Sequence, residues 1–163
     1  MAAPSSRSLR PVHLRWLVCL SAVVMLSALT CVLPAPAMAR AASAASCAQI
    51  AAQAGFSDEG LVMAVAIGLA ESGCNPRARL HNGPTSGCPD GSIDRGMWQI
   101  NDCYHAEVSD RCAYNVECNA QAAYRISAEG SDFRQWTTYR NGRYRAFLDQ
   151  AEAIVGWQGD DDG

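Results

Sequence analysis

The sequence contains no lysine, so all 13 of its lysine-or-arginine positions are arginines. They stand against 16 acidic residues, all of which follow residue 39, where ten of the arginines remain. The chain after residue 39 therefore carries a formal charge of −6. Non-specific binding to nucleic acid or to anionic membranes needs an excess of positive charge. We therefore expect neither nucleic acid nor membrane as a partner of this part of the chain.

The sequence also lacks the spacings of common zinc sites, since no cysteines stand as C-x2-C and no histidines as His-x3–5-His. It has no internal repeat and no second region of different composition. A length of 163 residues fits a single domain. We expect one domain that acts as a monomer, with no metal and no other cofactor.

Residues 1–39 have the pattern of a secretory signal peptide. Three arginines precede the apolar run WLVCLSAVVMLSALTCVL, and the small-residue site AMA follows it. A retained membrane anchor is the alternative, because about 20 apolar residues can span a bilayer. The two prolines just before AMA favour a signal peptide that is removed after Ala39. We therefore expect a secreted protein.

The mature chain would keep six cysteines, an even number typical of exported proteins that are stapled by disulfides. About fifteen pairings are possible, and the sequence alone does not choose among them. If Cys47 opens one helix and Cys74 follows the next, an antiparallel hairpin brings the two together. Cys112 and Cys118 are near enough in sequence to close a small loop. This geometry favours the pairs Cys47–Cys74, Cys88–Cys103 and Cys112–Cys118.

Helical patterns dominate after a short lead-in at residues 40–46. Ser57 is expected to cap the next helix, with Asp58 and Glu59 in its first turn and Glu71 in its last. The run LVMAVAIGLA at 61–70 leaves no face for water, so this helix must be central. Residues 73–92 hold four glycines, three prolines and two cysteines, which is typical of a stapled loop. Further helices are expected over 47–54, with Ser46 as cap, over 115–130, with Asn115 as cap and Gly130 as stop, and over 143–156. A strand pair or extended segment is expected over 92–101, and an irregular or short helical segment over 133–142. The predicted fold is a mostly α, disulfide-stapled single domain over 47–157 with at most a small β element, followed by an acidic tail at 158–163.

Glu71 stands at the end of the most apolar helix. The negative end of the helix dipole and the loss of solvent beside Ile67 would both raise its pKa. A carboxyl group that is still protonated near neutral pH can act as a general acid. The alternative is a charged residue that simply turns from the helix end to water. Asp94 is the candidate second carboxylate, and a plain turn residue is the alternative there.

Three motifs carry a resemblance to a known family: ESGCNP at 71–76, GMWQI at 96–100 and WTTYRNG at 136–142. In this order they resemble the soluble lytic transglycosylases of the lysozyme-like superfamily. GSIDRGMWQIN at 91–101 is also similar to a stretch of animal-type lysozymes, which carry Tyr where Arg95 stands. The resemblance implies a lysozyme-like catalytic domain that cleaves alternating amino sugars, above all peptidoglycan. The site residues that it implies are Glu71 as general acid, Ser72 beside it, Gln99 and Asn101 in the cleft, and Tyr139 near the acid.

The predicted function is a secreted glycosidase that cleaves peptidoglycan between N-acetylmuramic acid and N-acetylglucosamine. An Asp94 carboxyl about 5 to 5.5 Å from Glu71 would suit a retaining hydrolase, with Asp94 as nucleophile or ion-pair stabiliser. A separation of about 6.5 to 9.5 Å would leave room for an inverting water. If Asp94 points elsewhere, Glu71 alone would suit a lytic transglycosylase that leaves anhydro-muramyl ends.

The aromatic, cysteine and histidine residues near these motifs allow more than one interpretation. Trp98 either stacks on a sugar ring or packs in the core. Cys103 and His105 could belong to a cysteine peptidase, which needs a free thiolate beside a base. His81 and His105 are otherwise expected at the surface. A secreted glycan-binding module without turnover is also compatible with the sequence, since one fold can host several functions.

Overall fold

The computed structural model describes residues 35–156, with side chains described from residue 44. Most of the expected signal peptide and the acidic tail at 158–163 lie outside the described residues. All of the described residues belong to one structural unit. Among them, no helix combines the length and the apolar character that crossing a membrane requires.

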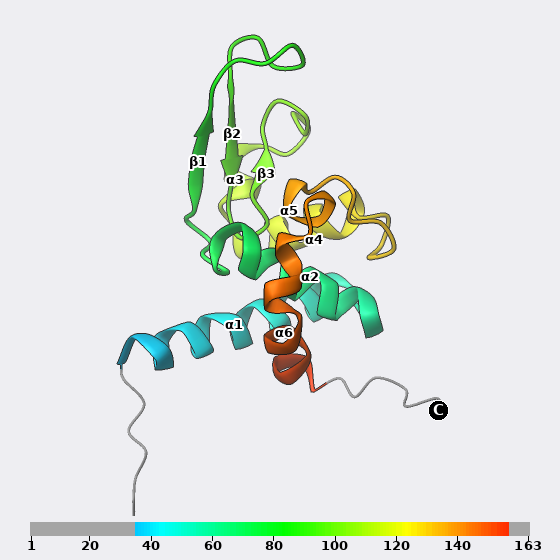
Figure 1. The fold of residues 1–163 in the computed structure, drawn as a ribbon. Coiled ribbons are helices and arrows are strands. Elements are labelled where there is room, and N and C mark those ends of the chain that lie inside the picture. The colour runs from blue at the N-terminus through cyan, green and yellow to red at the C-terminus, as the bar shows by residue number, and fades with distance from the viewer. Residues whose placement is uncertain (1–34, 157–163) are drawn as a thin grey trace, which may run out of the picture. The chain divides into compact units, whose positions relative to one another are not determined.

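Helices make up most of the described chain, and one small sheet completes it (Figure 1). This confirms the predicted mostly α fold with a small β element. The elements in chain order are α1 (Ala35–Ala54), α2 (Asp58–Ser72), β1 (Arg79–Asn82), β2 (Ser92–Arg95), β3 (Ile100–Asn101), α3 (Asp110–Ala113), α4 (Val116–Ile126), α5 (Thr137–Arg140), the 3-10 helix η1 (Arg143–Phe147) and α6 (Leu148–Val155).

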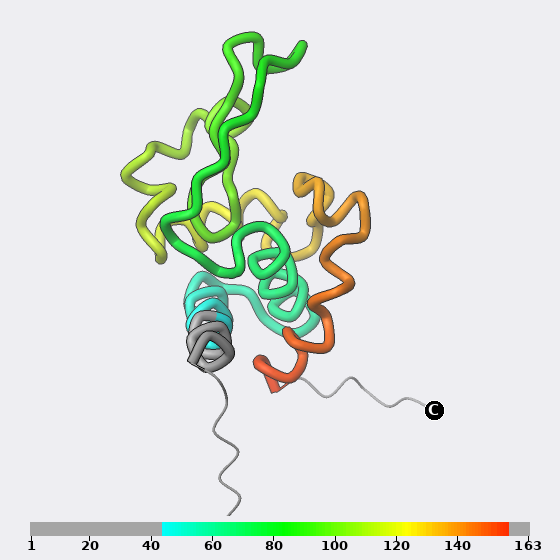
Figure 2. Tube along the Cα trace, turned by 60° about the vertical axis from the view of Figure 1, so that its left-hand side comes forward, coloured from blue at the N-terminus to red at the C-terminus, as the bar shows by residue number. Residues whose placement is uncertain are grey.

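Helix α2 is central, as its apolar run predicts. Every residue from Ala64 to Leu69 is buried, and α1, η1 and α6 pack against the helix. Figure 1 shows the sheet above α2 and helices α1 and α6 below it, and the turned view in Figure 2 keeps this order. Gly73 ends the helix in the left-handed conformation, with φ +63°, which glycine adopts without strain. Glu71 is thereby fixed in the last turn, next to the sheet.

The three strands form an antiparallel sheet in the order β1-β2-β3. Asp94 in the central strand pairs with Leu80 on one side and Asn101 on the other. The segment 92–101 is thus a strand pair, one of its two predicted forms. Strand β1 was expected as loop, and that expectation is wrong. Its residues are mostly exposed and show no alternation of apolar and polar side chains, so only pairing with β2 makes it a strand.

The three disulfides confirm the predicted pairing. Cys47–Cys74 joins α1 to the end of α2 with a Cα–Cα distance of 5.7 Å. Cys88–Cys103 ties the loop before β2 to the segment after β3, and Cys112–Cys118 closes a small loop. Because Cys103 is bonded to Cys88, it has no thiolate to act as a nucleophile. The cysteine peptidase interpretation is therefore wrong for this oxidised structure.

Several helix boundaries differ from those expected. Helix α1 begins at Ala35 and passes through Ser46, so Ser46 does not cap it. Ser57 does precede α2, but its side chain makes no capping hydrogen bond. Helix α4 has the expected cap, since the Asn115 side chain accepts a hydrogen bond from the Cys118 amide, but it ends at Ile126. After the helix, the hydroxyl of Ser127 accepts a hydrogen bond of 3.0 Å from the Gly130 amide. The helix therefore ends four residues before Gly130, the expected stop.

Candidate active site

The carboxyl group of Glu71 is half-buried at the end of α2. Its Oε1 accepts a hydrogen bond of 2.6 Å from the hydroxyl of Thr138. Burial raises its pKa above the ordinary value of 4.5. The Thr138 hydrogen bond opposes this rise, the negative charge of Asp94 adds to it, and the positive charge of Arg143 reduces it. A raised pKa is the property that the sequence predicts for a general acid at this position.

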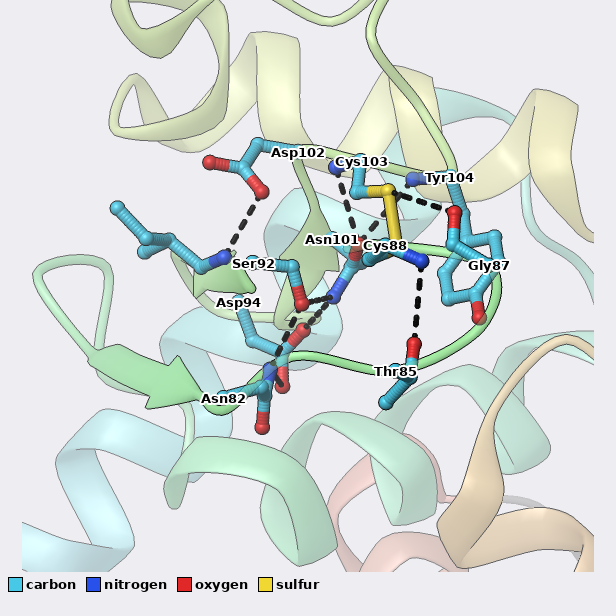
Figure 3. The surroundings of a disulfide bond; sticks show 11 residues. Asn82, Thr85, Gly87, Cys88, Ser92, Asp94, Asn101, Asp102, Cys103 and Tyr104 are labelled. Carbon is cyan, nitrogen blue, oxygen red and sulfur yellow. Dashed lines mark hydrogen bonds between the residues drawn. A yellow bond between two sulfur atoms is a disulfide. The ribbon is translucent and has the colours of Figure 1, made fainter. Parts of the chain in front are cut away.

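Two asparagine amides hold the carboxylate of Asp94 (Figure 3). The Nδ2 of Asn82, at the end of β1, donates to Oδ2 at 2.9 Å, and the Nδ2 of Asn101, in β3, donates to Oδ1 at 2.7 Å. Asn101 also donates to the Ser92 hydroxyl at 2.8 Å. Both carboxylate oxygens therefore accept hydrogen bonds from the flanking strands. The central strand presents Asp94 in a fixed orientation.

Asn101 also connects this network to the Cys88–Cys103 disulfide. Its Oδ1 accepts the backbone amides of Cys103 at 3.0 Å and Tyr104 at 3.1 Å. Figure 3 shows the disulfide and Tyr104 on one side of the Asn101 side chain and Asp94 on the other. One asparagine thus fixes both the second carboxylate and the stapled segment that follows β3.

A cleft of about 560 Å³ brings the two carboxylates together. Such a volume lies in the range of ligand-binding pockets, about 300 to 1,000 Å³. The described residues that line it are Glu71, Asn82, Thr85, Ser92, Asp94, Gln99, Ile100, Asn101, Tyr104, His105, Ile126, Gln135, Trp136, Thr137 and Arg140. One wall comes from the sheet and the stapled segment, and the other from the residues before and within α5. Most of the lining side chains are polar, and Ile100, Ile126 and Trp136 add apolar surface to the cleft.

Four of the seven predicted site residues line this cleft: Glu71, Asp94, Gln99 and Asn101. Ser72, beside the acid, turns to the protein interior instead. Its hydroxyl donates to the Met97 carbonyl at 2.6 Å and accepts the Asn75 amide at 3.0 Å. Ser72 thereby fixes the end of α2 to the turn before β3.

The remaining two predicted site residues, Trp98 and Tyr139, are aromatic and do not line the cleft. Trp98 is fully buried, and its indole donates to the Ala64 carbonyl at 2.9 Å. Trp98 is therefore a core residue, because a ring with 0% exposure has no face for a sugar. Tyr139 is half-buried and stacks on Tyr144 at a ring distance of 5.0 Å.

Sequence reasoning missed several residues of the site. Thr138 contacts the acid directly, and WTTYRNG drew attention to the neighbouring Tyr139. Asn82 lies in a segment that was expected as loop, so nothing indicated its contact with Asp94. Tyr104 and His105 line the cleft, and His105 was expected as an ordinary surface residue. Within residues 44–156, no group of three or more His, Cys, Asp or Glu side chains lies close enough to hold a metal ion.

The region that holds this site matches a known family. The family model described as a lysozyme-like domain matches residues 48–138, which is more than half of the chain. The matched region contains both carboxylates, both asparagines and Thr138. No curated protein and no solved structure matches the chain. The chain therefore belongs to the lysozyme-like domain family, a membership that indicates a peptidoglycan glycosidase or transglycosylase in general terms.

Proposed function

We propose that this protein is a secreted peptidoglycan hydrolase that cleaves the bond between N-acetylmuramic acid and N-acetylglucosamine. The observation that carries the proposal is the pair of carboxyl groups in one cleft, Glu71 with a raised pKa and Asp94 with two amide donors. Most glycoside hydrolases use two carboxyl groups, and the different environments of these groups give them different roles. The substrate class, peptidoglycan or a related N-acetylated glycan, follows from the family.

In the first step, Glu71 gives its proton to the glycosidic oxygen. The bond between that oxygen and C1 of the sugar breaks, and its electron pair stays with the leaving oxygen. Positive charge then develops at C1 and the ring oxygen. Asp94 carries the negative charge that stabilises this state or attacks C1 directly. Its orientation is fixed by Asn82 and Asn101 before the substrate arrives, so little reorganisation is needed during the reaction.

In the second step, a water molecule enters at C1 and completes the hydrolysis. The ionised Glu71 takes a proton from this water, which restores the acid for the next cycle. The product therefore has a free reducing end. If the 6-hydroxyl of the muramyl sugar attacked C1 in place of water, the product would carry an anhydro ring and would lack one water.

Secretion is the second part of the proposal. Three disulfides in one small domain are typical of proteins that fold in an oxidising compartment. The pattern of residues 1–39 supports the same conclusion. Mass measurement of the exported protein tests it, with an N-terminus at Arg40 as the expected result.

The reaction itself is tested by incubating the mature protein with purified peptidoglycan and analysing the soluble products by mass. Reducing muropeptides from the wild type, and none from Glu71→Gln, are the expected result. Glu59→Gln is the matched control, because Glu59 lies on the same helix but is exposed and away from the cleft. Anhydro-muramyl ends would replace hydrolysis with transglycosylation. Binding to peptidoglycan without any release would instead indicate a glycan-binding module.

A further inference from the structure

Thr138 reaches the carboxyl group of Glu71 from inside the protein. Its side chain is 4% exposed and does not line the cleft, while Glu71 does. The hydroxyl donates to Oε1 at 2.6 Å across 67 residues of sequence. The hydroxyl therefore engages Oε1 of Glu71 from the protein interior. A backbone hydrogen bond of Thr138 to the same carboxyl group also lowers the pKa of Glu71.

The segment that carries Thr138 is held by a relay of two buried indoles. The Nε1 of Trp136 donates to the carbonyl of Trp98 at 2.8 Å, and the Nε1 of Trp98 donates to the carbonyl of Ala64 at 2.9 Å. Ala64 lies in α2, seven residues or about two turns before Glu71. The relay and the Thr138 hydrogen bond thus start and end on the same helix, and they form a closed frame around the acid.

A second set of hydrogen bonds fixes this segment on its outer side. The guanidinium of Arg140 donates to the carbonyls of Arg134 at 2.7 Å and Gln135 at 3.2 Å, and to the Thr137 hydroxyl at 2.8 Å. These contacts bridge the residues on either side of Trp136. The backbone that presents Thr138 is therefore constrained from the core by tryptophan and from the surface by arginine.

We propose that Thr138 is the positioning residue of the general acid, and that its hydroxyl holds Oε1 of Glu71 so that Oε2 presents the proton to the cleft. This inference rests on the proposed role of Glu71. In the protonated acid, Oε1 is the carbonyl oxygen that accepts the threonine hydrogen, and Oε2 keeps its proton for the glycosidic oxygen. After the transfer, the same hydroxyl stabilises the carboxylate until it takes a proton from water.

The same contact sets the pH range in which Glu71 can work. Burial raises the pKa of Glu71, and the Thr138 hydroxyl is the strongest influence that lowers it. The charged groups that act on the acid are Asp94 from the sheet, which raises the pKa, and Arg143 from η1, which lowers it. Loss of the hydroxyl would leave burial less opposed. The carboxyl group would then keep its proton to a higher pH.

The test compares Thr138→Val with Thr138→Ser in the mature, disulfide-bonded protein. Valine keeps the shape of threonine without the hydroxyl, and serine keeps the hydroxyl. For Thr138→Val we expect kcat on peptidoglycan to fall about tenfold, the scale of one lost hydrogen bond at a reacting group. KM should stay near that of the wild type, and the alkaline limb of the pH profile should move to higher pH. Thr138→Ser should restore both kcat and the limb.

A carboxyl-carbon NMR titration of Glu71 gives a readout that does not depend on turnover. The Glu71 signal should titrate at a higher pH in Thr138→Val than in the wild type and in Thr138→Ser. An unchanged titration in folded Thr138→Val overturns the inference, and so does a Thr138→Ser variant that stays impaired. If the titration shifts as expected but the wild type releases no product from peptidoglycan, the proposed function fails while the contact between Thr138 and Glu71 stands.

Discussion

The burial of Glu71 has opposite consequences for its proposed chemistry and for the stability of the folded protein. The proposed role as general acid requires Glu71 to keep its proton to a higher pH than an ordinary glutamate, and burial at the end of α2 raises its pKa in that direction by making the ionised form unfavourable. The same burial lowers the stability of the folded protein once the proton leaves. Chemistry and stability are therefore coupled at this residue.

We predict that Glu71→Gln is inactive but more stable than the wild type at neutral pH. Glutamine can still accept the Thr138 hydrogen bond, and it never ionises. In the wild type, the folded state binds the Glu71 proton more tightly than the unfolded state, so stability falls as pH rises through the window that begins near 4.5. The advantage of glutamine should thus be absent below pH 4.5 and full above the raised pKa of Glu71.

Urea unfolding followed by circular dichroism at several pH values measures this difference. Glu59→Gln is the control, since Glu59 is exposed in the first turn of the same helix, where the dipole favours its charge. Its replacement should leave the stability unchanged or lower it slightly at neutral pH. A Glu71→Gln variant that is equally stable at every pH would contradict the expected cost of burying the carboxylate.

The sequence indicated Glu71 because the reason for its properties is local. Ten apolar or glycine residues in a row precede this carboxylate. Such a run indicates a buried helix and places Glu71 at its end. Thr138 could not be found in this way, because its contact with Glu71 depends on how segments 67 residues apart pack together. Trp98 shows the same difficulty, since its neighbours in sequence are equally compatible with a core ring and with a cleft ring.

At the scale of elements, the small sheet is the support of the second carboxylate. Asp94 lies in β2, and each of its neighbours, β1 and β3, contributes one asparagine amide to it. Such support depends on the register of the strands, because a shift by one residue would turn each side chain to the other face. The sheet is short, and its register is reinforced by the polar contacts that it provides.

We predict that Asn82→Ala lowers kcat/KM on peptidoglycan by about tenfold, the scale of one hydrogen bond to a charged group. The loss arises because Oδ2 of Asp94 no longer has its amide donor. His81→Ala is the matched control on the same strand, since His81 is exposed and is not among the cleft residues. Comparable losses in both variants, or none in either, would show that β1 does not position Asp94.

Strand β1 is an element that the sequence did not predict. A stretch with several glycines and prolines and mostly exposed residues has the composition of a loop, and most of residues 73–92 are one. Four of these residues become a strand only because β2 offers a partner. Helix α2, in contrast, was predicted from its sequence, because Ser57 and the two acids after it mark the start of the helix and the apolar run marks its body.

At the scale of the whole molecule, we expect the three disulfides to differ in how much each contributes to stability and to activity. The bridges span 27, 15 and 6 residues of sequence. If the main effect is on the unfolded chain, they contribute about 3.5, 3 and 2 kcal/mol respectively. Removing Cys47–Cys74 by a double Cys→Ala change should therefore lower the melting temperature most, and removing Cys112–Cys118 should lower it least. Calorimetry of the three double variants measures this order.

Activity should follow a different order among the variants that remain folded. Cys88–Cys103 borders the cleft, and the amides of Cys103 and Tyr104 hold the Asn101 side chain that positions Asp94. We predict that kcat/KM falls severalfold without this bridge and stays close to the wild type without Cys112–Cys118. Equal activity in both variants would show that Asn101 positions Asp94 even when the Cys88–Cys103 disulfide is absent.

The indole relay between α2 and α5 also gives the protein an optical signature. Trp98 and Trp136 are fixed by hydrogen bonds to carbonyls and are 0% and 6% exposed. Immobilised aromatic rings produce near-ultraviolet circular dichroism, which disappears when tertiary packing is lost even if the helices remain. The two rings hold the segment that carries Thr138, so this spectrum reports on the arrangement around Glu71. A preparation that keeps its helices but has lost this band has lost the arrangement that places Thr138 against Glu71.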